Sequence, residues 1–91
     1  MNSETHQLIR RTIIRHTGLS ASGLHPRLRL EADLDLTPLE LVLIALEIEE
    51  AVGTEISVDG LESVDTVADL MRYFRRALSA ARHSGSLRSV A

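Results

Sequence analysis

The sequence predicts an all-α protein, a small four-helix bundle of three main helices plus one short helix, with a long loop between helices 1 and 2. The chain has 91 residues, which suffices for one domain with one core. Apolar residues recur every three and four positions in three segments, and each segment has a recognisable start or stop. Hydrophobic residues make up 44% of the chain but aromatic residues only 2%, so an aliphatic core is expected.

The first helix is predicted over residues 3–17, because Ser3 can cap its start and Gly18 can end it. Residues 19–36 show no helical period and contain glycine and proline. The leucines within this stretch nevertheless require burial. We therefore expect a long loop that is anchored to the core, or one that contains a short helical turn.

The second helix has the clearest start signal, the tetrapeptide Thr37-Pro38-Leu39-Glu40. Thr37 can act as the N-cap, Pro38 suits the first helical position, and Glu40 can complete a capping box. The helix is predicted to end near Val52, before a glycine. Almost every residue between Leu39 and Ile48 is aliphatic, so part of this apolar surface is expected to be exposed.

The remaining elements are a short helix within residues 58–63 and a final helix that Thr66 and Asp69 begin. Apolar residues repeat in the final helix as far as Leu78. The sequence then becomes small, polar and basic. We predict a helical domain over residues 1–78 and a flexible basic tail over residues 79–91.

Charge is strongly segregated along the chain. Twelve of the 13 carboxylates lie between Glu31 and Asp69, and all ten positive charges are arginines outside that stretch. An acidic centre repels nucleic acid and attracts basic protein surfaces. The alternative interpretation is an ordinary solvated surface.

Several classes of site are excluded by the residue types. Without cysteine there is no disulfide or thiolate, and the four scattered histidines do not have metal-ligand spacing. We expect no metal site and no catalytic residues, and hence no enzyme. The apolar runs are too short for a membrane span, and the polar N-terminal residues do not resemble a signal peptide, so a cytoplasmic location is expected.

Residues 31–57 carry the most specific pattern, EADLDLTPLELVLIALEIEEAVGTEIS. This segment resembles the central motif of acyl carrier proteins: an acidic-leucine pair, Asp-Ser-Leu, an acidic amphipathic second helix and a Glu-Ile step. The resemblance continues without a gap from Ile13-Ile14 to Tyr73-Phe74, about two-thirds of the chain.

The resemblance implies four helices and a serine, at the start of the second helix, that takes a 4′-phosphopantetheine arm. Pro38 occupies that position, Thr37 replaces the preceding aspartate, and Asp35 replaces a glycine of the loop. Only Leu39 of the attachment triplet remains. Because proline has no hydroxyl, no cofactor is expected; the alternative is an arm on Thr37, whose hydroxyl lies one residue early.

The resemblance also implies that partner enzymes bind the second helix through its acidic and exposed apolar residues. Helical geometry places one apolar group on one side (Leu39, Val42, Leu43, Leu46) and a second group on the other (Leu41, Ile44, Ala45, Ile48). Both groups cannot face the core, although Leu43, which replaces an acidic recognition position, could turn into the core or a dimer. The candidate partner-binding residues are Leu39, Glu40, Val42, Leu43, Leu46, Glu47, Glu49 and Glu50.

These observations predict an acyl-carrier-like docking or regulatory module of fatty-acid, polyketide or related lipid biosynthesis. Its expected partners are enzymes of acyl-chain synthesis or transfer, or a second copy in a homodimer. Two alternatives stay open: a working carrier with its arm on Thr37, and a helical adaptor unrelated to acyl metabolism.

Overall fold

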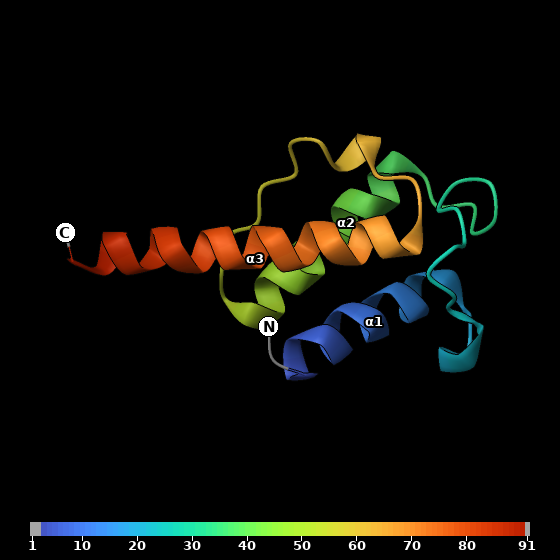
Figure 1. Cartoon of the computed structure of the whole chain (residues 1–91), viewed down its shortest axis with the longest axis horizontal. Helices are drawn as coiled ribbons and strands as arrows, with labels where there is room; N and C mark the ends of the chain where they lie inside the picture. Colours follow the sequence, from blue (N-terminus) through green and yellow to red (C-terminus); the bar gives the residue numbers. More distant parts are fainter. Residues whose placement is uncertain (1–2, 91) are drawn as a thin grey trace.

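The computed structural model describes residues 3–90, and the side chains of residues 4–20 and 22–79 within them. Three α-helices form the bundle: α1 (Ser3–Thr17), α2 (Pro38–Val52) and α3 (Val67–Val90). Two 3-10 turns, η1 (Ala21–Gly23) and η2 (Leu61–Ser63), lie in the connections. α1 packs against both α2 and α3, and α3 crosses the bundle and continues past it (Figure 1). The predicted all-α carrier-like fold is confirmed.

The start and stop signals act as expected. Thr37 and Glu40 form a capping box at the start of α2, and Gly53 ends α2 with a left-handed φ of 71°. At the start of α3 the backbone N–H of Thr66 donates to Asp69 Oδ2, while the N–H of Asp69 donates to Thr66 Oγ1. These caps satisfy backbone groups that have no partner within their own helix.

The core is aliphatic apart from one phenylalanine. Its fully buried side chains come from all three helices, so packing between the helices supplies most of their stability. The long loop contributes as well: Leu24, Leu30 and Leu36 are buried, while Leu28 and Leu34 pack half-buried against the core. The buried core consists of Ile9, Ile13, Leu24, Leu30, Leu36, Leu41, Ile44, Ala45, Ile48, Ile56, Leu61, Val67, Leu70, Phe74 and Leu78.

Hydrogen bonds fasten the long loop to the first turn of α3. The N–H groups of Val67 and Ala68 donate to the carbonyls of Leu28 and Pro26, both at 2.9 Å. The N–H of Leu30 donates to the Asp65 carbonyl at 2.8 Å. The loop therefore supplies acceptors that the helix itself lacks at its N-terminus.

Two element boundaries differ from the prediction. The short helix expected within residues 58–63 is a single 3-10 turn, because Gly60 precedes it with a φ of 87° that an α-helix cannot contain. α3 does not end near Leu78 but continues to Val90, in a segment without proline. The side chains after Ser79 lie outside the described ones, so the division into a domain and a flexible basic tail stays a prediction.

Candidate functional site

The start of α2 is held in one conformation by the capping box. Thr37 Oγ1 accepts the backbone N–H of Glu40 at 3.2 Å and donates to Glu40 Oε1 at 3.4 Å. The backbone N–H of Thr37 donates to the same carboxylate oxygen, also at 3.4 Å. The Thr37 hydroxyl thus has both an acceptor and a donor partner inside the first turn of the helix.

Pro38 is the first residue of α2 and is exposed. Its ring carries no hydrogen-bonding side-chain atom, and its missing N–H belongs to a position where a helix makes no backbone bond. The residue therefore begins the helix well and offers no nucleophile.

Asp35 precedes this turn with a φ of 56°, in the left-handed region. Aspartate tolerates this region better than most residues, and glycine better still. The resemblance to acyl carrier proteins places a glycine at this position. The backbone here thus has a conformation that suits glycine, although the residue is an aspartate.

A small cleft of about 200 Å³ lies beside Pro38. Buried leucines form its inner wall, and three carboxylates, those of Glu31, Glu62 and Asp65, belong to its lining. Its volume is below the ~300–1,000 Å³ of typical small-molecule sites.

The outer face of α2 is apolar, as helical geometry predicts. Leu39, Leu43 and Leu46 are 67%, 43% and 49% exposed, whereas Leu41, Ile44, Ala45 and Ile48 are buried. Val42 is half-buried and packs against the core. The alternative in which Leu43 turns into the core is therefore wrong. We call Leu39, Leu43 and Leu46 the outer leucines of α2.

The carboxylates of α2 are mostly engaged within the chain. Glu47 forms an ion pair with Arg15 at 3.0 Å and a second pair with His16, which connects α2 to the end of α1. Glu49 accepts the backbone N–H of Ile56 at 2.9 Å, while Glu40 belongs to the capping box. Glu50 is exposed and has no ion pair with any side chain described here.

The contacts of Glu47 with Arg15 and His16 were not anticipated from the sequence. Periodicity shows which residues share a helix face but does not show which faces of two helices meet. The signal available was two basic residues in the last turn of α1, a position that also suits the helix dipole.

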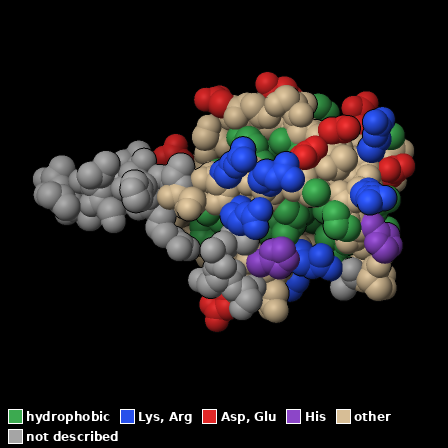
Figure 2. Space-filling model, in the orientation of Figure 1, with side chains coloured by type: hydrophobic (Ala, Val, Ile, Leu, Met, Phe, Trp, Pro, Cys, Tyr) green, Lys and Arg blue, Asp and Glu red, His purple; other side chains and the backbone are tan. Residues whose placement is uncertain are grey.

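Basic and acidic side chains are partly segregated on one face of the molecule. Arginines gather over the middle of the face that α3 crosses, and most of the carboxylates visible there lie at its margin (Figure 2). Among the described side chains of α3, the exposed arginines are Arg72, Arg75 and Arg76. The separation of charge along the chain therefore persists only in part on this face, because Arg29 and Arg72 form ion pairs with Asp65 and Asp69.

The described part of the chain offers neither a metal site nor a membrane-spanning helix. It contains no group of three or more histidine, aspartate or glutamate side chains arranged to hold a metal ion. Within the same residues, none of the helices combines the length and apolarity that crossing a bilayer requires.

Comparison with known families gives a match over most of the chain. The family model described as the phosphopantetheine attachment site matches residues 7–74, about three quarters of the chain. The match includes most of α1, all of α2 and η2, and the start of α3. Acyl carrier domains of this kind carry groups between enzymes and are not catalysts themselves, which agrees with the expectation that the chain is not an enzyme. This chain belongs to the phosphopantetheine attachment site family, the family of the acyl carrier proteins.

Proposed function

We propose that this protein is a docking or regulatory module of fatty-acid, polyketide or related lipid biosynthesis that does not receive a phosphopantetheine arm. The observation that carries the proposal is the start of α2, where Pro38 occupies the position at which acyl carrier proteins have their serine. The helix that partner enzymes bind in this family is retained with its apolar face exposed.

The residues at this position do not fit the attachment chemistry. A phosphodiester to phosphopantetheine requires a hydroxyl oxygen, which Pro38 lacks. The Thr37 hydroxyl is bonded to Glu40 on both its donor and its acceptor side, so the alternative arm on Thr37 would disrupt the capping box. Loss of such a cap costs about 1 kcal/mol.

The docking surface that we propose consists of the outer leucines of α2 with Glu50 beside them. Three of the four α2 carboxylates are engaged within the chain, and the position of a family carboxylate is taken by Leu43. Recognition therefore rests more on apolar contact than on charge. An enzyme partner with an apolar groove fits this surface better than one with a purely basic patch.

Intact-mass measurement after incubation with coenzyme A and a broad-specificity phosphopantetheinyl transferase tests the lost attachment. We expect an unchanged mass for the native protein. The matched control is the double variant Thr37→Asp, Pro38→Ser, which restores the family triplet Asp-Ser-Leu and should gain one arm. A mass gain on the native protein, mapped to Thr37 or to any other residue, contradicts the proposal. A folded but unmodified double variant contradicts the assignment of the loss to these two positions.

Capture of partners from the source cell tests the docking role. The native protein should retain an enzyme of acyl-chain synthesis or transfer, and Leu43→Glu should retain much less because it places a charge in the apolar contact. Arg75→Gln, an exposed change on α3, is the matched control. Recovery of no such enzyme by the native protein would remove this part of the proposal.

A further inference from the structure

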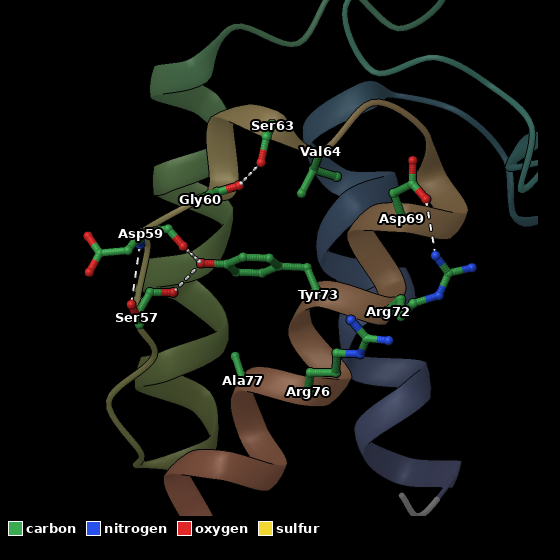
Figure 3. A pocket seen from close by; sticks show the side chains of 10 residues that line it. All are labelled: Ser57, Asp59, Gly60, Ser63, Val64, Asp69, Arg72, Tyr73, Arg76 and Ala77. Atoms are coloured by element: carbon green, nitrogen blue, oxygen red, sulfur yellow. Dashed lines mark hydrogen bonds and ion pairs between the residues drawn. The ribbon is translucent and has the colours of Figure 1, made fainter.

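A second and larger cavity lies along α3, and its lining includes no residue of α2. Its volume is about 490 Å³, within the range of sites that bind small molecules. It shares only Ser63 and Val64 with the cleft beside Pro38. Figure 3 shows the segment from Ser57 to Val64 along one side and α3 along the other.

The Tyr73 ring lies across the cavity between these two sides (Figure 3). Its hydroxyl donates to the carbonyls of Ser57 and Asp59, at 2.7 and 2.9 Å. These two bonds hold the ring in place and join the 57–59 segment to α3. Val64 and Ala77 add apolar surface on the two sides of the ring, above and below it in Figure 3. The cavity therefore offers a fixed apolar floor.

Two arginines of α3 line the rim of the cavity opposite the 57–59 segment. Arg72 and Arg76 are one helical turn apart on α3 and extend from the same side of the helix (Figure 3). Arg72 Nη1 lies 3.3 Å from Asp69 Oδ1, an exposed ion pair that leaves most of its N–H donors unused. Arg76 forms no ion pair with any side chain that the structure describes. Like charges at this spacing repel, and an anion between them would relieve the repulsion.

The carboxylates near the cavity neutralise that rim only in part, because Asp69 pairs with Arg72 while no described carboxylate pairs with Arg76. The Asp59 side chain points away from Tyr73, and the Asp69 carboxylate is bonded to Thr66 and Arg72 (Figure 3). Asp59 and Glu62 instead act at the hydroxyl end of Tyr73, where burial and then these two charges raise the pKa of the phenol. The cavity is thus positive at the α3 rim and negative at the opposite end.

The geometry points to a binding site for a small anionic amphiphile, a molecule with an aliphatic body and one carboxylate. Its body would lie over the Tyr73 ring, between Val64 and Ala77, and its carboxylate would be held by Arg72 and Arg76. The negative charges at the hydroxyl end exclude the reverse orientation. The site does not depend on the proposed function, because it includes neither the start of α2 nor the outer leucines.

Chemical-shift titration of the ¹⁵N-labelled full chain tests the site, with octanoate as the probe. We expect saturable shifts in residues 57–64 and 72–77, at octanoate concentrations well below those at which the acid forms micelles. Octanol, which lacks the anion, and inorganic phosphate, which lacks the aliphatic body, should each bind much more weakly.

Neutral variants identify the residues involved. Arg76→Gln and Arg72→Gln should each weaken octanoate binding about twofold to fivefold, the order expected for loss of one exposed ion pair. Ala77→Leu should weaken binding, because the larger side chain narrows the cavity beside the Tyr73 ring. Arg75→Gln, on the same helix but outside the cavity, is the matched control and should bind as the native protein does.

Three results would overturn the inference. The first is an absence of saturable shifts in these segments, and the second is equal binding of octanol or phosphate. The third is an equal loss of affinity in Arg75→Gln, which would show that binding depends only on the overall positive charge of α3. None of these results depends on phosphopantetheine attachment or on capture of an enzyme.

Discussion

Pro38 and Asp35 differ in how well each residue type suits the backbone conformation at its position. Pro38 suits its position, because it begins a helix where its missing N–H has no consequence. Asp35 suits its position less well, because the left-handed φ of 56° there favours glycine. Of the three replacements relative to the acyl carrier pattern, Pro38 therefore favours the fold and Asp35 does not.

Asp35→Gly is expected to stabilise the protein by about 0.5 kcal/mol, because glycine reaches this conformation without a Cβ clash. Urea unfolding followed by circular dichroism measures the change. Ala51→Gly, in the last turns of α2, is the control and should instead lose about 0.5–1 kcal/mol. A less stable Asp35→Gly would show that the aspartate contributes more than its backbone strain costs.

The phenol of Tyr73 should titrate above its ordinary pKa of 10.0, because burial and the charges of Asp59 and Glu62 disfavour the phenolate. Tyr73 is the only tyrosine and the chain has no tryptophan, so ultraviolet absorbance reports this group alone. The stabilisation associated with the neutral phenol is complete below the pKa of the unfolded chain and is lost as the pH rises through that of the folded chain. Identical titration curves for folded and urea-unfolded protein would contradict this expectation.

Helices and their caps are the part of the fold that the sequence predicts best. Thr37-Pro38-Leu39-Glu40 and Thr66 with Asp69 are local signals, because the groups that bond are at most three residues apart. The 3-10 turn at Leu61–Ser63 and the long course of α3 were predicted less well, since helix length after a good start depends on packing and on weak propensities.

The cap of α3 makes the stability of this helix sensitive to acid. Hydrogen bonding by the Thr66 side chain, then by its backbone, and the charge of Arg72 lower the pKa of Asp69 below its ordinary value of 3.8. The stability that this carboxylate contributes is present above the pKa of the unfolded chain, about 4, and is lost as the pH falls through the folded value.

Asp69→Asn should therefore flatten the dependence of unfolding free energy on pH in the acid range. Urea unfolding of both proteins at a series of pH values from neutral to acid measures the difference. Equal slopes for the variant and the native protein would show that Asp69 is not perturbed by its cap.

The whole molecule separates its apolar residues into a core and an outer face of α2. The sequence predicts this division, because a helix that is aliphatic on both sides cannot bury both in so small a bundle. It does not predict the contacts between distant segments, such as Arg15 and His16 with Glu47 or Tyr73 with the 57–59 backbone. Those contacts depend on which surfaces meet in three dimensions. The candidate cavity on α3 depends on one of them, the contact of Tyr73 with the 57–59 backbone.

Ile44→Ala and Leu43→Ala, neighbours on α2, should differ sharply in unfolding free energy. Ile44 is fully buried and its truncation should cost about 2–5 kcal/mol, a large part of the stability of a small domain. Leu43 is 43% exposed and its truncation should change stability by at most about 0.5–1 kcal/mol. Comparable losses, measured by chemical denaturation, would mean that Leu43 is covered in solution, as in a homodimer.

The hydrogen bonds from Val67 and Ala68 to the Leu28 and Pro26 carbonyls have a consequence for local opening of the chain. Amides in the first turn of a helix ordinarily exchange rapidly with solvent deuterium, as that of Leu39 in α2 should. Those of Val67 and Ala68 can exchange only after residues 26–28 separate from α3. Their protection factors therefore measure the free energy of releasing the long loop, and values equal to those of the slowest core amides would show that loop and helix open as one cooperative unit.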